Sequence, residues 1–151
     1  RLGVDSELKG RGRPCNSLCM PEINWLAVLA AAASTFVIGG LWYSPLLFYK
    51  PWLRANGFSE ADVQKGNPGV IFGLTFVFAL IMAANLAAFL AAPDTTLAWG
   101  ATAGALTAVW VVLGIAVVAL FERRPWAYTL VNGGYWLVSF VIMGAILGGW
   151  R

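Results

Sequence analysis

Four long stretches of the chain contain no charged residue, and this feature limits the fold more than any other. They cover residues 23–49, 66–93, 95–121 and 125–150. A helix needs about 20 apolar residues to cross the roughly 30 Å hydrocarbon core of a bilayer, so each stretch is long enough to span it. We therefore expect four membrane spans, listed here by approximate residue range: 23–48, 68–92, 95–121 and 126–150.

The composition leads to the same conclusion. Of the 151 residues, 60% are hydrophobic and only 11% are charged, whereas a soluble domain carries about 25% charged residues. Lipid offers the backbone no hydrogen-bond partners, so only helices or closed barrels span it, and these stretches lack the alternation of barrel strands. The predicted fold is an all-α, four-transmembrane-helix bundle formed by residues 20–151. A secreted domain, a nucleic-acid reader and a multidomain enzyme are excluded.

Residues 1–19 differ from the rest, because they are polar and basic and contain no apolar run that could serve as a signal peptide. Two interpretations stay open: a segment foreign to the natural protein, with Met20 as the natural start, or a basic arm attracted to anionic lipid headgroups. Cys15 and Cys19, the only cysteines, have neither a histidine nor a second pair for a zinc site. We expect them to be free thiols.

The connections between the spans also carry structural signals. Pro45 lies late in the first span and should bend or end its helix, because proline removes a backbone donor and clashes with the preceding turn. In the long first connection, Ser59 followed three residues later by Asp62 resembles a helix N-cap, so we expect a short surface helix over residues 59–65. Asn67 and Pro68 should open the second span.

The basic residues predict an orientation. Five of them, Lys50, Arg54, Lys65, Arg123 and Arg124, lie in the two hairpin tips, and only Arg151 lies on the opposite side if the protein starts at Met20. Because Lys and Arg are enriched in cytoplasmic loops, the tips are then cytoplasmic and both termini lie outside. With residues 1–19 included, the count is five against five.

The sequence also suggests an internal repeat. A shift of 74 residues aligns 25–52 with 99–126, and Lys50-Pro51-Trp52 then matches Arg124-Pro125-Trp126. This predicts two tandem helical hairpins related by a pseudo-twofold axis along the membrane normal. Small residues spaced four apart allow helices to approach closely. The candidate helix-packing positions are Gly69 with Gly73, Gly100 with Gly104, and Gly144 with Gly148.

The spans offer little chemistry. They contain no Asp, Glu, Lys, Arg or His, and the chain has no histidine at all, so we expect no catalytic residue, no metal site and no cofactor. Among their polar residues, Asn85, Asn132 and Thr107 are the candidate ligand or helix contacts. Asn85 should face another helix, because an unpaired amide in lipid is costly. A cavity lined by all three would indicate a carrier or binder of an uncharged solute, lipid, pigment or quinone.

The exit of the first span has two interpretations. The aromatic and proline residues Trp42, Tyr43, Ser44 and Pro45 form either an interfacial anchor with a helix break, or a shallow pocket in which freed carbonyls lie beside aromatic faces.

The stretches 23–28, 40–48 and 50–52, with Trp-Tyr-Ser-Pro as their most distinctive part, resemble the opening of the bacterial membrane-protein family catalogued as domain of unknown function 1761. The resemblance covers about residues 20–151. It implies a small four-helix protein of the bacterial inner membrane and no particular activity.

The leading functional expectation is a non-catalytic membrane protein that packs within the lipid bilayer against other membrane protein subunits or against itself. The alternative is the carrier or binder named above.

Overall fold

The computed structural model describes residues 23–150. The predictions made for residues 1–19, Met20 and Arg151 lie outside this range. The described chain is all-helical and contains α1 (Trp25–Trp42), α2 (Tyr49–Asn56), α3 (Glu60–Val63), α4 (Pro68–Phe89), α5 (Leu97–Phe121) and α6 (Trp126–Gly149). By length and composition, α1, α4, α5 and α6 can each cross a membrane. The predicted all-α fold with four membrane-length helices is confirmed, and the chain is a multi-pass membrane protein.

Side-chain caps set where three of the long helices begin. The Asn24 side chain accepts hydrogen bonds from two backbone amides at the start of α1, and Asn67 does the same for α4. The Thr96 side chain accepts one from the backbone of Trp99 at the start of α5. These amides have no partner within the helix, so the caps satisfy them.

The first span is shorter than the predicted range 23–48, because α1 ends at Trp42. Residues 43–48 form turns instead, and the amide of Phe48 donates to the carbonyl of Trp42 at 3.0 Å. Pro45 stands in these turns, where it supplies no amide for a continued helix. In the long connection, Ser59 and Asp62 form a capping box, and the helix it starts is α3.

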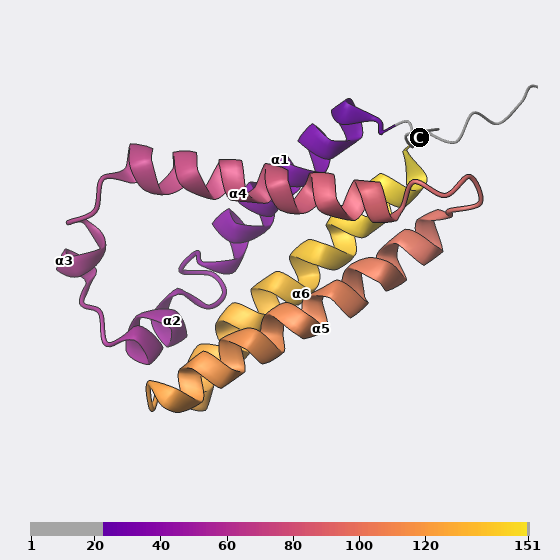
Figure 1. Ribbon diagram of the computed structural model, residues 1–151. Coiled ribbons are helices and arrows are strands. Elements are labelled where there is room, and N and C mark those ends of the chain that lie inside the picture. The colour runs from indigo at the N-terminus through magenta and orange to yellow at the C-terminus, as the bar shows by residue number, and fades with distance from the viewer. Residues whose placement is uncertain (1–22, 151) are drawn as a thin grey trace, which may run out of the picture.

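The helices α5 and α6 form a tight antiparallel pair, seen as the orange and yellow ribbons in Figure 1. A Cβ atom added to Gly100 or Gly104 would overlap the carbonyl of Gly144 or Phe140, and one added to Gly148 would lie 2.6 Å from the carbonyl of Thr96. The two backbones are therefore in direct contact, as small residues permit.

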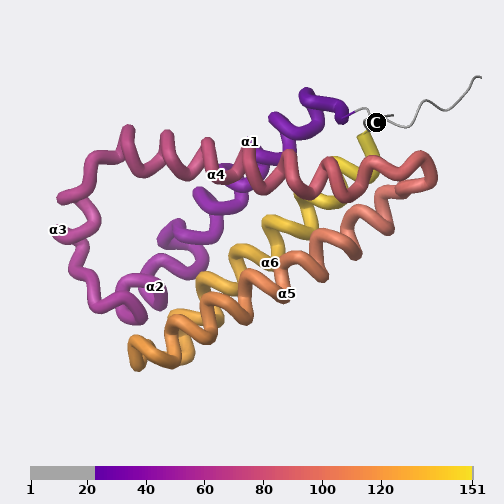
Figure 2. The backbone as a smooth tube through the Cα atoms, in the orientation of Figure 1, coloured from indigo at the N-terminus to yellow at the C-terminus, as the bar shows by residue number. Residues whose placement is uncertain are grey.

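The glycines of α4 differ from these four. A Cβ on Gly73 would meet no atom within 4 Å, and one on Gly69 would meet only the capping side chain of Asn67. The structure therefore places no second helix against the face of α4 that carries this pair, and the N-terminal end of α4 diverges from α5 and α6 (Figure 2).

The other helices pack around the α5–α6 pair. The helix α1 packs on α6 and on α4, and α2 packs on α6. A strict twofold axis would require α4 to pack on α5 as α1 packs on α6. Instead α4 runs obliquely across the bundle and is not packed along α5. The internal repeat stays a prediction from the sequence.

Candidate functional site

The Trp-Tyr-Ser-Pro corner, residues 42–45, connects the end of α1 to α6. The indole Nε1 of Trp42 donates to the carbonyl of Val131 at 3.0 Å, and the hydroxyl of Tyr43 donates to Oδ1 of Asn132 at 2.9 Å. The Trp42 ring also lies over Gly134, where an added Cβ would come within 2.8 Å of the ring. Both aromatic side chains therefore contact α6 through specific hydrogen bonds, and the Trp42 ring also packs against its backbone.

The carbonyls at this helix break are occupied locally. The carbonyl of Leu41 accepts from the hydroxyl of Ser44 at 2.7 Å and from its amide, and the carbonyl of Trp42 accepts from Phe48. Pro45 is exposed beside them. These contacts favour the anchor interpretation over a ligand pocket, because the carbonyls that would line such a pocket are already hydrogen-bonded.

A lateral groove opens between α4 and α5. Its volume is about 760 Å³, and α6 contributes Phe140 to its lining. The lining is mostly aliphatic and aromatic: Ile81, Met82, Asn85, Leu86, Phe89, Trp99, Ala103, Leu106, Thr107, Trp110, Val111 and Phe140. The groove exists because α4 diverges from α5, so side chains on their facing sides have no helix to pack against.

Two of the predicted polar residues, Asn85 of α4 and Thr107 of α5, line this groove from its two sides. The amide of Asn85 donates to the carbonyl of Ile81 in its own helix at 2.9 Å, and the hydroxyl of Thr107 donates to the carbonyl of Ala103. The sequence predicts that Asn85 faces another helix. Within residues 23–150 its side chain bonds only within α4, and the groove separates it from α5.

The third predicted residue is separate from the groove. Asn132 accepts from Tyr43 and donates to the carbonyl of Tyr128 at 2.9 Å, so both ends of its amide are used at the α1 corner. A single cavity lined by Asn85, Asn132 and Thr107 is therefore not formed. Asn132 connects helices, whereas the other two face an open space.

Sequence reasoning missed the aromatic lining of the groove. Trp110 is 82% exposed and lies near the middle of α5, far from either end of the span. Tryptophan prefers the headgroup level. A tryptophan in mid-span was therefore a signal of a candidate site on this face of α5. Trp99 and Phe89 extend the aromatic lining toward the N-terminal end of α5.

A family model described as "Protein of unknown function (DUF1761)" matches residues 26–148, which include the corner and the whole groove lining. Neither the curated proteins nor the solved structures contain a match to this chain.

Proposed function

The chain belongs to the DUF1761 family, and from this premise we propose that it is a non-catalytic membrane protein that packs against another transmembrane helix. In this role it serves as an accessory or assembly subunit of a larger membrane complex, or as a homo-oligomer. We place it in the bacterial inner membrane, with the hairpin tips in the cytoplasm. The absence of Asp, Glu, Lys, Arg and His from the four uncharged stretches supports a packing role over a catalytic one.

The α4/α5 groove is the observation that carries the proposal. Helices in lipid associate through close packing and hydrogen bonds, because lipid tails are as apolar as the side chains and supply no hydrophobic drive. A groove of about 760 Å³ with Trp110 on its rim gives a partner helix both shape and contact area. Within residues 23–150, Oδ1 of Asn85 accepts no hydrogen bond, so a donor from a partner would relieve its desolvation.

Photo-cross-linking in native membranes tests this function. A photoreactive amino acid replaces Trp110 or Asn85 in the groove, or Leu130 or Val117 as controls that are exposed but outside it. We expect protein adducts from the groove positions and lipid adducts from the controls. An adduct of twice the chain mass identifies a second copy, and any other mass identifies a different subunit. Equal protein adducts at all four positions would refute the role of the groove.

The groove also supports a second candidate function, the binding of an uncharged lipid, pigment or quinone. Small-molecule sites commonly have volumes of about 300–1,000 Å³ and an apolar lining with a few polar groups. The groove falls in this range, and Asn85 with Thr107 supplies the polar groups.

Mass spectrometry of molecules that co-purify with the protein tests this alternative. Thr107→Val removes one polar group of the groove. Thr102→Val is the matched control, because Thr102 also lies on α5 and donates to its own helix but does not line the groove. A bound molecule that is lost in the first variant and retained in the second would support binding. Equal retention in both would count against it.

A further inference from the structure

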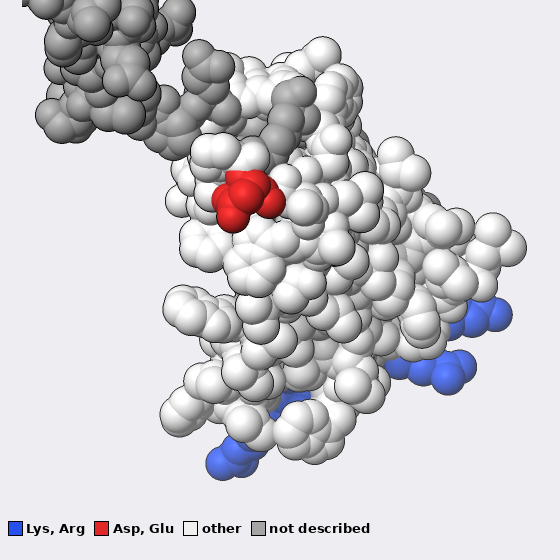
Figure 3. All heavy atoms as spheres, turned by 90° about the vertical axis from the view of Figure 1, so that its right-hand side faces the viewer, with Lys and Arg blue, Asp and Glu red and all other residues white. Residues whose placement is uncertain are grey.

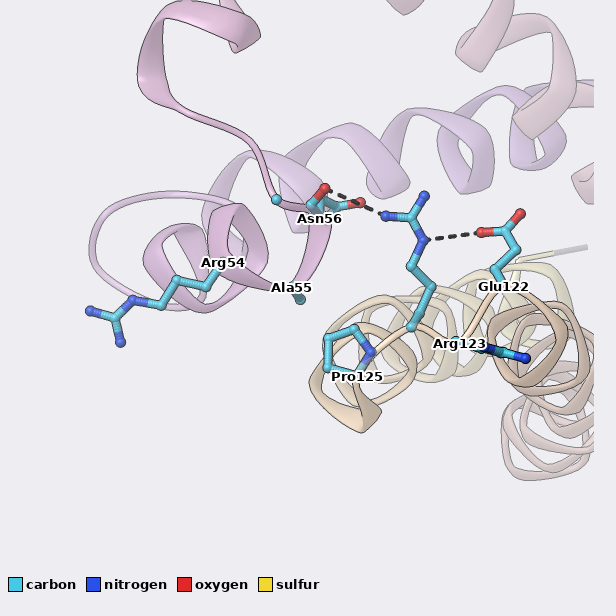
Figure 4. A pocket seen from close by; sticks show the side chains of 8 residues that line it. Arg54, Ala55, Asn56, Glu122, Arg123 and Pro125 are labelled. Atoms are coloured by element: carbon cyan, nitrogen blue, oxygen red, sulfur yellow. Dashed lines mark hydrogen bonds and ion pairs between the residues drawn. The ribbon is translucent and has the colours of Figure 1, made fainter.

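A second pocket, of about 560 Å³, lies where the end of α2 meets the turn between α5 and α6. In the sequence, Glu122, Arg123 and Arg124 are three consecutive charged residues between the third and fourth uncharged stretches, and no sequence feature indicates that α2 reaches them. The structure brings the two segments together, as Figure 4 shows. The lining residues are Arg54, Ala55, Asn56, Gly57, Glu122, Arg123, Arg124 and Pro125.

The pocket has an excess of positive charge. It contains three arginines and one glutamate. Glu122 accepts from Nε of Arg124 at 3.1 Å, and Nη1 of Arg124 makes a long contact of 3.5 Å with the carbonyl of Asn56. Arg124 is thereby directed between α2 and the α5–α6 turn. Within the described part of the chain, Arg54 and Arg123 form no ion pair, and in Figure 4 their side chains extend in opposite directions.

The pocket adjoins an apolar surface. A smaller cavity of about 120 Å³ shares Arg123 and Arg124 with it and is otherwise lined largely by apolar residues, including Leu120 and Trp126. Trp126 is 67% exposed at the first turn of α6, the level that tryptophan prefers in a bilayer. On the face shown in Figure 3, basic side chains lie toward the lower part of the molecule, and a single small group of acidic atoms lies toward the upper part.

We propose that this arginine pocket binds the phosphate of an anionic phospholipid, with the lipid's glycerol and upper acyl chains on the neighbouring surface of α5 and α6. Arginine forms paired, charge-assisted hydrogen bonds with phosphate oxygens, and basic pockets between transmembrane helices suit such headgroups. The adjoining apolar surface at the membrane interface favours a lipid over a free anion, which would use only the polar part. This inference does not depend on the α4/α5 groove.

Native mass spectrometry of the full chain, titrated with phosphatidylglycerol or phosphatidylcholine, tests the proposal. Arg54→Gln and Arg123→Gln each remove an unpaired charge from the pocket. We expect each to weaken phosphatidylglycerol binding about tenfold, the effect of losing one charged hydrogen bond. Lys50→Gln is the matched control, because it removes an exposed charge at the same end of the molecule but outside the pocket. It should change binding less than about twofold.

Glu122→Gln supplies a readout of opposite sign. It removes the carboxylate that competes for Arg124, so phosphatidylglycerol should bind several-fold more tightly, a gain that misfolding would not produce. Three outcomes would overturn the proposal: equal binding of both lipids by the unmodified chain, an equal loss in Lys50→Gln, or displacement of the lipid by inorganic phosphate at equal concentration. The last outcome would identify a free-anion site.

Discussion

The hydroxyl of Tyr43, just after α1, donates a 2.9 Å hydrogen bond to the side chain of Asn132, in the second turn of α6. These residues are 89 positions apart, and the bond joins the first membrane helix to the last. The amide of Asn132 is held in turn by the carbonyl of Tyr128. The orientation of the acceptor is therefore held by a hydrogen bond within its own helix.

A double-mutant cycle measures this bond. Tyr43→Phe and Asn132→Ala should each destabilise the protein, and the double variant should lose less than the sum, because both changes remove the same interaction. We expect a coupling energy of about 0.6–1.7 kcal/mol, the range found for hydrogen bonds between membrane helices. Equilibrium unfolding in mixed micelles gives the four values.

Tyr49→Phe is the control for the cycle. Tyr49 stacks on Trp52 through its ring, and its hydroxyl makes no hydrogen bond within residues 23–150. Loss of this hydroxyl should leave the free energy of unfolding nearly unchanged. A coupling energy indistinguishable from zero would show that the Tyr43 contact contributes nothing to the docking of α1.

The α5–α6 contact should be the least tolerant of added volume. In Gly100→Ala, the new methyl group would overlap the backbone carbonyl of Gly144, which cannot move aside like a side chain. We expect the free energy of unfolding to fall by at least the 1–3 kcal/mol or so typical of overpacking, and thermal unfolding in detergent should show it.

Gly114→Ala is the matched substitution on the same helix. An added Cβ there meets no atom within 4 Å, so only helix propensity acts, and stability should stay the same or rise by up to about 1 kcal/mol. If both alanine variants unfolded at the same temperature, the close approach of α5 and α6 would not determine stability.

The sequence predicts the four long helices, the break at Pro45 and the start of α4 at Asn67, because these depend on local properties: apolar length, a proline, and a polar side chain at a helix start. The caps Asn24 of α1 and Thr96 of α5 were not predicted. The glycine pattern was ambiguous by itself. The spacing of Gly69 and Gly73 is the same as that of Gly100 and Gly104, but only the second pair meets a helix. Spacing shows which faces can pack and does not show which helix will lie opposite.

The candidate sites were harder to predict for the same reason. The groove depends on α4 leaving α5, although the two helices follow each other in sequence and would ordinarily be expected to pair. The arginine pocket depends on α2 reaching the α5–α6 turn, so that Arg54 and Arg124 line one cavity from segments about half the chain apart. No periodicity in a single sequence encodes such crossings.

The capping box of α3 should be sensitive to acid. Asp62 is held by Lys65 and by the side chain and backbone of Ser59, and these bonds lower its pKa from 3.8 to about 2. A lowered pKa means that the ionised cap stabilises α3 at pH values above 3.8. This stabilisation is lost as the pH falls through about 2, where the carboxylate becomes protonated. Carbon NMR of the Asp62 carboxyl in micelles measures the titration directly.

Two variants separate the causes of this shift. Lys65→Gln should move the pKa of Asp62 upward by the larger amount, because the Lys65 bond is the largest contribution, and Ser59→Ala should move it by less. Added salt should weaken the first contribution, since both partners are exposed. Titration of Asp62 at its ordinary value in the unmodified chain would show that the box does not form in solution.

The charge distribution of the fold predicts how the protein crosses the membrane. All five lysines and arginines of residues 23–150 belong to α2, the α2–α4 connection or the α5–α6 turn. Asp94 lies in the α4–α5 connection, which α4 separates from the first two of these segments and α5 separates from the third. Because basic loops stay in the cytoplasm, Gln64→Cys should be protected from a membrane-impermeant maleimide in intact bacterial spheroplasts, and Asp94→Cys should be labelled. Both variants also carry Cys15→Ser and Cys19→Ser, so that the introduced cysteine is the single labelling site. Labelling after lysis controls for the reactivity of that cysteine. The reverse pattern would place the arginine pocket in the outer leaflet and would show that residues outside 23–150 set the orientation.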